Sequence, residues 1–549
     1  MSTKQDYRIL DRDIAIFSFE INSSRQFEQK PFAPDRSYLQ ECLSRNDALM
    51  RRAAELEVFD RVSEIFRNRF TDVLNEQRDR LQHIAKDPSG LLANHVYYLQ
   101  HLARLDKRSS HEKALLSAQR LEKLQIVSDA VTDLLKDAPE ASTRVKAMIS
   151  YLIHDMDAVM EDLPQDYADL DEDELYKLTS AFKDAQEKLK KFADDLPASD
   201  ASDDPSRIDS ERYRELLMNK FGVDLDELIR DHEADIEETR ERVFSLSQAL
   251  PIAEEEKPHN MQEVSAVLNK YAGPAENAEK MFVRISDYLE RGRRIAHENV
   301  NLPDDEKCNC HTIPSTLKVT FPWGGYESGD DTRRPIEGQM FLNNYNVSAV
   351  TDGWMKINAI HECYPGHHVQ YVRRITDRTP ECVKMDTRNI PLIEGTAIRT
   401  ETVFAGIYDD DPFYPVFAAY RRHHASVRIK VDLWLYLERK SKEECRDLYI
   451  KELGFDPATA MGQVEAQLSR PGYFTCYHYG LKKILQWEKE SGMTVKDYTE
   501  LLFRAGDISI LDFRKYLDLT PEERYSYSHD YASLVRDFND LPDLCTTVI

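Results

Sequence analysis

The sequence lacks the excess of positive charge that proteins binding nucleic acids or anionic membranes carry. It holds 99 aspartates and glutamates against 73 lysines and arginines, a formal net charge of −26 over 549 residues. Both kinds of partner need a positive face on the protein. We therefore expect neither nucleic acid nor membrane as a partner, although a local basic pocket is compatible with this composition.

Long apolar segments and a cysteine framework are missing as well. No stretch approaches the roughly 18 apolar residues that span a bilayer. The first residues, MSTKQDYRILDRDIAIF, lack the basic segment and apolar run of a signal peptide. The 8 cysteines are scattered over the whole chain, which does not indicate a disulfide scaffold in a protein of this length. These absences predict a cytoplasmic protein.

Most of the chain is predicted to be helical. Apolar residues recur at three- and four-residue spacing between about residues 45 and 195, and this pattern resumes after the acidic loop at 193–206. Past residue 300, LKVTF (317–321) and QMFLNNY (339–345) are predicted strands. Helices dominate again beyond 390. The predicted fold class is therefore mainly α with a small β-sheet.

The length suggests two to four folding units, unless one large helical body takes most of the chain. We divide it into an N-terminal helical region (1–205), a helical region continuing the same body (206–310) and a region with the sheet and the C-terminal helices (311–549). A C-x-C-H cluster at residues 308–311 lies at the second boundary. A structural zinc site needs four ligands and no second cysteine pair follows, so we interpret this cluster as a loop.

HECYPGHH, residues 361–368, carries the strongest chemical signal. His361 and Glu362 begin like H-E-x-x-H, in which two histidines one helical turn apart bind zinc beside a glutamate base. Pro365 stands where the second histidine is expected, and His367 and His368 follow it. In an unbroken helix either one would lie about 9–10 Å along the axis from the first histidine. That distance is too long for two ligands of one ion.

A break in the helix would shorten this distance. Tyr364 precedes a proline and is pushed away from helical geometry, and Gly366 permits a turn that other residues resist. We therefore expect the helix to end, bulge through residues 364–366 and resume. Which of His367 and His368 faces the metal is open at this point, and a histidine-rich turn that caps a helix is the alternative interpretation.

IPLIEGTAIRTETVF, residues 390–404, offers a third ligand. Glu394 lies in a predicted helix, and its neighbours at 392, 393, 397 and 398 are apolar, which favours burial. Glu401 follows two turns later on the same face, where it could support a ligand from behind.

These motifs resemble the bacterial DUF885 family, which is placed among the gluzincin-type, thermolysin-like metallopeptidases. HECYPGHHVQ is similar to its H-E-x-x-P-G-H-H signature, LIEGTAIRTE to its E-G-W-A-x-x-x-E segment and RIKVDLWLY to its R-x-x-x-D-x-x-x-H segment. RPGYFTCYHYG (470–480) resembles its P-G-Q-A-x-x-Y-K-x-G segment, and DTRRPIEGQMFLNNYN resembles its strand leading to the site. The resemblance implies a large helical zincin-like body with a small β-sheet beside the metal-site helices.

The resemblance also implies zinc as the cofactor. Its ligands would be His361, one histidine of the pair His367 and His368, and Glu394. Glu362 would be the general base and proton shuttle.

Further positions follow from the same resemblance. Tyr477 matches a tyrosine that could donate to the oxyanion of a tetrahedral intermediate. Arg428 could bind a substrate carboxylate, although an ion pair with Asp432 four residues on is an equal alternative. His478 stands where the family has lysine and could replace it, or could simply pack. Other departures near the site are Thr396, Tyr473 and Tyr436.

The sequence thus favours a zinc-dependent hydrolase of amide or peptide bonds that acts on short peptides. The predicted strand at 339–342 could hold an extended peptide by edge pairing, and the N-terminal helices would wall the cleft. A hydrolase of a non-peptide amide or modified amino acid is one alternative. A non-catalytic helical binding protein that retains the metal site is another, although it would not need Glu362. No oligomeric state is predicted.

Overall fold

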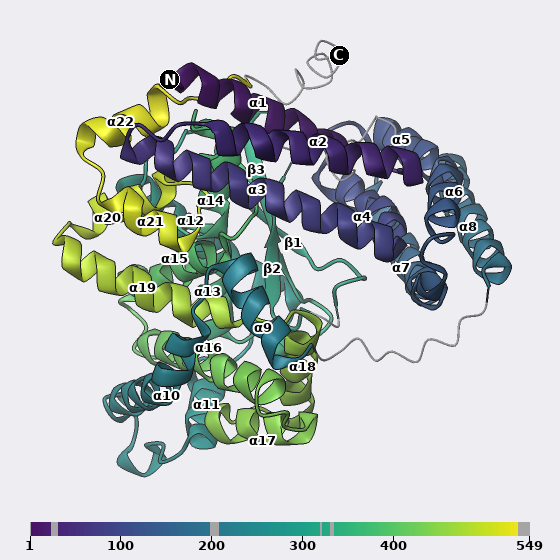
Figure 1. Ribbon diagram of the computed structural model, residues 1–549. Helices are drawn as coiled ribbons and strands as arrows, with labels where there is room; N and C mark the ends of the chain where they lie inside the picture. The colour runs from purple at the N-terminus through teal and green to yellow at the C-terminus, as the bar shows by residue number, and fades with distance from the viewer. Residues whose placement is uncertain (1, 23–30, 198–207, 319–320, 330–333, 536–549) are drawn as a thin grey trace.

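The computed structural model describes residues 2–22, 31–197, 208–318, 321–329 and 334–535. Its first eight helices run over the top and along one side of the molecule (Figure 1). They are α1 (Lys4–Ile21), α2 (Arg36–Glu55), α3 (Arg61–Lys86), α4 (Ser89–Leu105), α5 (Ser110–Glu122), α6 (Leu124–Leu134), α7 (Ser142–Asp166) and α8 (Glu172–Asp195).

Four helices lead from there to the sheet, and ten follow it. The first group is α9 (Ser210–Leu216), α10 (Leu225–Gln248), α11 (Met261–Tyr271) and α12 (Ala278–Asn299). The second group is α13 (Asp352–Asn358), α14 (His367–Thr376), α15 (Ile390–Val403), α16 (Tyr414–Tyr436), α17 (Lys442–Leu453), α18 (Pro457–Ser469), α19 (Thr475–Ser491), α20 (Val495–Arg504), α21 (Ile510–Leu517) and α22 (Pro521–His529).

Local signals in the sequence begin many of these helices. Capping boxes, in which a side chain and a backbone N–H satisfy each other reciprocally, open α5 at Ser109 and Glu112 and α17 at Ser441 and Glu444. One buried apolar cluster then joins α1 to the residues after α22. The predicted mainly α fold is confirmed, and the division into three regions stays a prediction. Across the described ranges, no helix is both long and apolar enough to cross a membrane.

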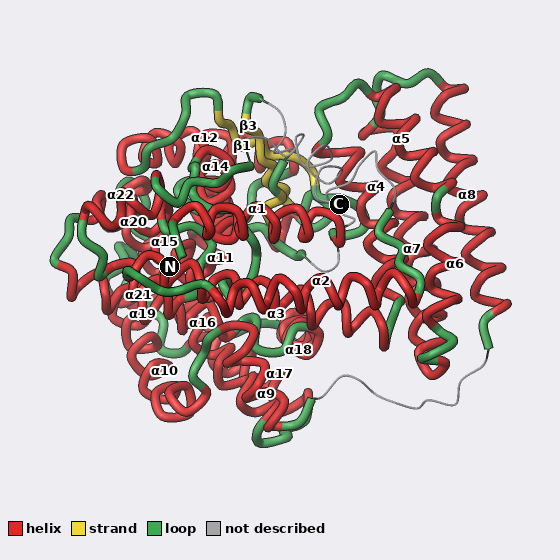
Figure 2. The backbone as a smooth tube through the Cα atoms, turned by 45° about the horizontal axis from the view of Figure 1, so that its top comes forward, coloured by secondary structure: helices red, strands yellow, loops and turns green. Residues whose placement is uncertain are grey.

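The sheet has three strands, β1 (Glu306–Thr312), β2 (Gly324–Glu327) and β3 (Ile336–Leu342), in the order β1-β3-β2. The first pairs parallel with β3 and the second pairs antiparallel with it. Figure 2 shows these strands between α12 and α14 on one side and α4 on the other. The predicted small sheet is therefore present beside the helices that carry the histidine motif.

Three predictions about the sheet were wrong in detail. The C-x-C-H segment is not a loop but β1, in register with β3 from Glu306 opposite Ile336 onward. In the predicted strand at 317–321, residues 317–318 form a turn, 319–320 lie outside the described residues, and a strand forms at β2 instead. Because β3 is paired on both sides, its residues 339–342 have no free edge for a peptide.

Two glycines set the distance between α15 and α19. A Cβ on Gly395 would lie 2.5 Å from the carbonyl carbon of Gly480, and a Cβ on Gly480 would lie 1.7 Å from the carbonyl oxygen of Pro391. The backbones of the two helices are thus in direct contact. This contact brings Glu394 of α15 beside the tyrosines at the start of α19.

Replacing Gly480 by alanine tests this contact. The added methyl group has no space, so we expect the free energy of unfolding to fall by about 1–3 kcal/mol, the usual cost of overpacking a core. The matched control is Gly462→Ala in α18, where no atom lies within 4 Å of the added Cβ. That control should keep or gain stability, by up to about 1 kcal/mol, since alanine favours helix. Equal urea midpoints for both variants would contradict the packing argument.

Candidate metal centre

The first half of the histidine motif ends a helix. α13 continues into a π-helical turn, η6 (Ala359–Cys363), which carries His361 and Glu362. Tyr364 then turns extended, with φ −127° and ψ 115°, and its N–H still donates to the carbonyl oxygen of Ala359 at 2.9 Å. This is the expected end of the helix before the proline.

The second half of the motif restarts a helix against the first. α14 begins at His367, directly after Gly366. A Cβ on Gly366 would lie 1.8 Å from the carbonyl oxygen of His361, so the two chain segments touch at a position where only glycine fits. The rings of His361 and His367 are consequently 4.8 Å apart between centroids. The predicted bulge is therefore confirmed.

Three ligand atoms converge at this point. His361, His367 and Glu394 each offer one atom, and these atoms all lie within 4.8 Å of one another. The Nε2 atoms of both histidines are 3.4 Å from Oε2 of Glu394. Two ligands of a tetrahedral ion with bonds of about 2.0–2.1 Å lie roughly 3.3 Å apart, so this spacing suits a single cation.

The remaining ring nitrogens are held by acceptors. Nδ1 of His361 lies 2.8 Å from Oε1 of Glu401, and Nδ1 of His367 lies 2.7 Å from Oε1 of Gln370. Donation of Nδ1–H to such an acceptor leaves Nε2 as the free lone pair, which is the usual arrangement behind a histidine ligand. Glu401 was anticipated from its spacing, whereas nothing in the sequence distinguished Gln370.

Charge at this point favours a cation. Burial alone would lower the pKa of His361, but the nearby carboxylates of Glu394, Glu401 and Glu362 raise it to about 10. The pKa of His367 is also raised despite burial, chiefly by Glu394. Oε2 of Glu394 is buried and makes no hydrogen bond. The donor set, its geometry and its unsatisfied oxygen therefore fit a divalent metal ion.

Two tyrosines of the α19 region complete the surroundings. The hydroxyl of Tyr473 donates to Oε1 of Glu394 at 2.7 Å, and the hydroxyl of Tyr477 donates to that of Tyr473 at 3.5 Å. The ring of Tyr477 lies parallel to that of His361, with centroids 6.2 Å apart. Sequence reasoning noted Tyr473 only as a departure from the family pattern. Its role in holding Glu394 depends on the contact between α15 and α19.

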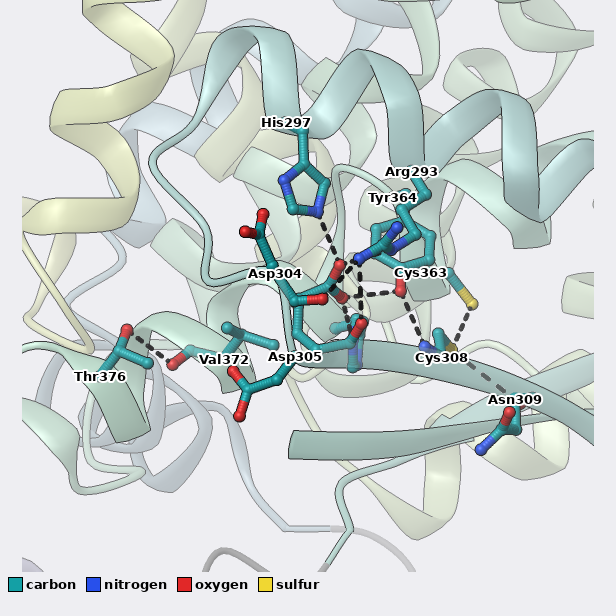
Figure 3. Close-up of polar contacts among 12 residues, drawn as sticks. Arg293, His297, Asp304, Asp305, Cys308, Asn309, Cys363, Tyr364, Val372 and Thr376 are labelled. Carbon is teal, nitrogen blue, oxygen red and sulfur yellow. Dashed lines mark hydrogen bonds and ion pairs between the residues drawn. The ribbon is translucent and has the colours of Figure 1, made fainter. Parts of the chain in front are cut away.

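His368 turns away from the three ligands. Its Nε2 lies 2.9 Å from Oε2 of Glu306 in β1, and its Nδ1 lies 3.0 Å from the hydroxyl of Tyr326 in β2. The same glutamate accepts hydrogen bonds from Tyr364, Arg293 and His297. Figure 3 shows these three side chains converging, with Cys308 and Cys363 beside them. The histidine that sequence reasoning left open is therefore the first of the pair, and the second ties the motif to the sheet.

The two residues predicted to bind substrate, His478 and Arg428, lie outside the group of metal ligands, and Arg428 does not form the alternative ion pair with Asp432. Nε2 of His478 lies 3.6 Å from a carboxylate oxygen of Asp235 in α10. Arg428 donates to Gln463 at 3.0 Å, and its guanidinium lies 5.4 Å from the centroid of the Tyr477 ring. Asp432 instead accepts hydrogen bonds from Tyr213, Thr475 and Gln467.

Comparison with known proteins agrees with the motifs. The chain matches the family described as bacterial protein of unknown function (DUF885) over residues 26–506. It belongs to the DUF885 family. No curated protein matches this DUF885 chain. The resemblance drawn from the motifs is thus confirmed for the family, while the link to zinc peptidases is not shown by this match.

Two solved structures share the fold of this DUF885 protein. The crystal structure of a candidate lipoprotein from Colwellia psychrerythraea has a TM-score of 0.74 and 14% identity, covering 94% of this chain and 99% of that one. A candidate lipoprotein of unknown function from Shewanella oneidensis has a TM-score of 0.65 and 13% identity, covering 94% and 100%. At these identities the likeness establishes the fold alone.

Metal titration distinguishes the ligands. We expect the protein to bind about one zinc ion per chain. Loss of a residue that only hydrogen-bonds a ligand weakens metal binding by about 10–100-fold, and we expect His367→Gln, which removes a ligand, to weaken zinc binding by more than this. His368→Gln is the matched control, because His368 contacts Glu306 instead, and it should keep the affinity. Calorimetric zinc titration of both variants measures this. Equal losses in the two variants would contradict the assignment.

Glu306 makes the stability dependent on pH. Burial would raise its pKa, but hydrogen bonds from His368, His297 and Tyr364 lower it to about 2. Because the pKa is below the unfolded value of about 4.3, its contribution is present above pH 4.3 and is lost as pH falls toward 2. Glu306→Gln should cost about 3–5 kcal/mol at pH 7. Urea unfolding should show that the difference in unfolding free energy between the variant and the wild type disappears between about pH 4 and 2. A difference that is constant with pH would refute the role of the Glu306 charge.

Proposed function

We propose that this protein is a zinc-dependent hydrolase of amide or peptide bonds that acts on short peptides. The observation that carries the proposal is the convergence of His361, His367 and Glu394, with the unbonded oxygen of Glu394 in the middle. Three protein ligands leave a fourth position open, as catalytic zinc sites do and structural ones do not. Glu362, next in sequence to the first ligand, is half-buried, and its negative charge raises the pKa of both histidine ligands.

Each nearby side chain then has a chemical task. Zinc held by the three ligands would polarise a carbonyl and lower the pKa of a water molecule. Glu362 accepts the proton of the attacking water and delivers it to the leaving amine. Burial raises the pKa of Tyr477 well above its usual value, so its hydroxyl stays protonated and can donate to the carbonyl oxygen as negative charge develops.

Replacing Glu362 by glutamine separates metal binding from turnover. We expect Glu362→Gln to keep zinc and to lose about 10²–10⁴-fold in kcat, the usual contribution of a positioned general base. Zinc content by elemental analysis and hydrolysis of a dipeptide panel, beside non-peptide amides, measure both quantities. A fully active variant would refute the role of Glu362. Turnover of the non-peptide amides alone would replace peptides as the substrate class.

The cellular location is a separate part of the proposal. Composition predicted a cytoplasmic protein, whereas the two structural relatives are described as candidate lipoproteins, which favours the cell envelope. Fractionation of cells that express the chain from its native gene would decide between the two locations.

A further inference from the structure

Two arginines on one face of α16 are buried without an anionic partner among the described residues. Arg421 and Arg428 lie seven residues, or about two helical turns, apart, and their exposed fractions are 7% and 5%. Nε and Nη1 of Arg421 and Nε of Arg428 are buried and make no hydrogen bond. Over the residues that the structure describes, no carboxylate lies within 4.0 Å of either guanidinium group.

The other buried arginines among the described residues have acceptors for their N–H groups, either backbone carbonyl oxygens, as for Arg69 and Arg120, or carboxylates. Arg399 binds Glu488 through two hydrogen bonds, and Arg373 binds both Asp377 and Glu500. The partner of Arg428 is instead the neutral side chain of Gln463. Burial and the charge of Arg421 lower the pKa of Arg428 to about 10, which leaves it charged at neutral pH. Within the part of the chain that the structure describes, no carboxylate therefore forms an ion pair with these two positive charges on α16.

These arginines adjoin the candidate metal centre. Their Cζ atoms lie 5.6 Å and 5.4 Å from the centroid of the same Tyr477 ring. The hydroxyl of that tyrosine reaches Tyr473, which in turn holds Glu394. The side chain of Tyr477 therefore lies between the two guanidinium groups and the group of metal ligands, which it contacts through Tyr473.

A buried charge without a partner destabilises a fold. Proteins retain such groups where a bound ligand of opposite charge serves as the partner. Arginine binds carboxylates bidentately through its planar fork of N–H donors. Each arginine also lies beside an aromatic ring, with the Phe474 centroid 4.6 Å from Cζ of Arg428 and the Trp354 centroid 6.0 Å from Cζ of Arg421. The site therefore offers a binding position for one carboxylate next to an apolar group.

We propose that Arg421 and Arg428 bind the C-terminal carboxylate of a short peptide. This deepens the proposed hydrolase function and rests on it. A peptide advances about 3.3–3.6 Å per residue, and one tyrosine side chain separates the arginines from the ligands. The bond cleaved is therefore the first or second from the carboxyl terminus, and the substrates are short peptides with a free C-terminus.

Binding to the full-length Glu362→Gln variant tests this without relying on turnover. N-acetyl-alanyl-phenylalanine and its C-terminal amide form the matched pair of probes in a calorimetric titration with zinc present. We expect the acid to bind at least about 30-fold more tightly than the amide. Adding Arg421→Gln or Arg428→Gln should remove this preference and leave the weak binding of the amide unchanged. Arg422→Gln is the control, because Arg422 lines a cavity with Glu238 and Glu241 instead, and it should keep the preference.

Three results would overturn the inference. The first is equal binding of the acid and the amide to the zinc-loaded protein. This measurement needs no arginine variant, so it does not depend on whether the arginine variants fold. The second is a preference that survives in both arginine variants. The third is equally tight binding of the α-amide of N-acetyl-alanyl-glutamic acid, in which the side-chain carboxylate is the only one. Absence of peptide hydrolysis by the zinc-loaded wild type, with the preference for the acid intact, would instead count against the hydrolase function alone.

Thermal unfolding distinguishes recognition from a structural role. If the arginines exist for a ligand, Arg421→Met should keep or raise the Tm of the ligand-free protein, since it removes an unpaired buried charge. The acid probe should raise the Tm of the wild type and leave that of the variant unchanged. A lowered Tm in Arg421→Met, together with no probe effect on the wild type, would assign the pair to the fold.

Discussion

The contact between Gly366 and the carbonyl oxygen of His361 is the constraint on which the site depends. It allows the chain to leave one helix at Cys363 and start the next at His367 with the two histidine rings side by side. An uninterrupted helix would separate these rings by more than a turn. The close approach of α15 and α19 then adds Glu394 and the tyrosines to the same place. Both arrangements require glycine where backbones touch, because a Cβ there would overlap a neighbouring carbonyl group.

Charge is distributed unevenly around Tyr477. On one side, three glutamates lie beside two histidines, and their negative charge favours binding of a cation. These glutamates are Glu362, Glu394 and Glu401. On the other side, two arginines without carboxylate partners call for an anion. A peptide whose carbonyl oxygen faces a metal ion and whose terminal carboxylate faces the arginines would satisfy both needs at once. The protein thus places two sets of buried charge of opposite sign on either side of one tyrosine ring.

Much of the fold could be predicted from local pattern. Helical periodicity and capping residues depend on neighbours three and four positions away, so the helices and the interruption at Pro365 could be inferred directly. The first two strands could not, because β1 is a strand only through its register with β3, thirty residues later, whereas alternation located part of β3. The segment at residues 308–311 was interpreted as a loop for this reason. The same non-local pairing closed both edges of β3, which local alternation does not reveal.

The sequence by itself determined that His361, Glu362 and Glu394 stand in a pattern typical of zinc hydrolases, because those residue types and their spacing are properties of the chain. Only the tertiary structure decided that His367 joins them while His368 binds Glu306, since two adjacent residues of a helix point about 100° apart and packing selects the one that faces inward. It alone showed that Arg428 has Arg421 for a neighbour and, among the described residues, no carboxylate in contact with it. The absence of a partner is a property of the surrounding space, and the order of residues along the chain does not record it.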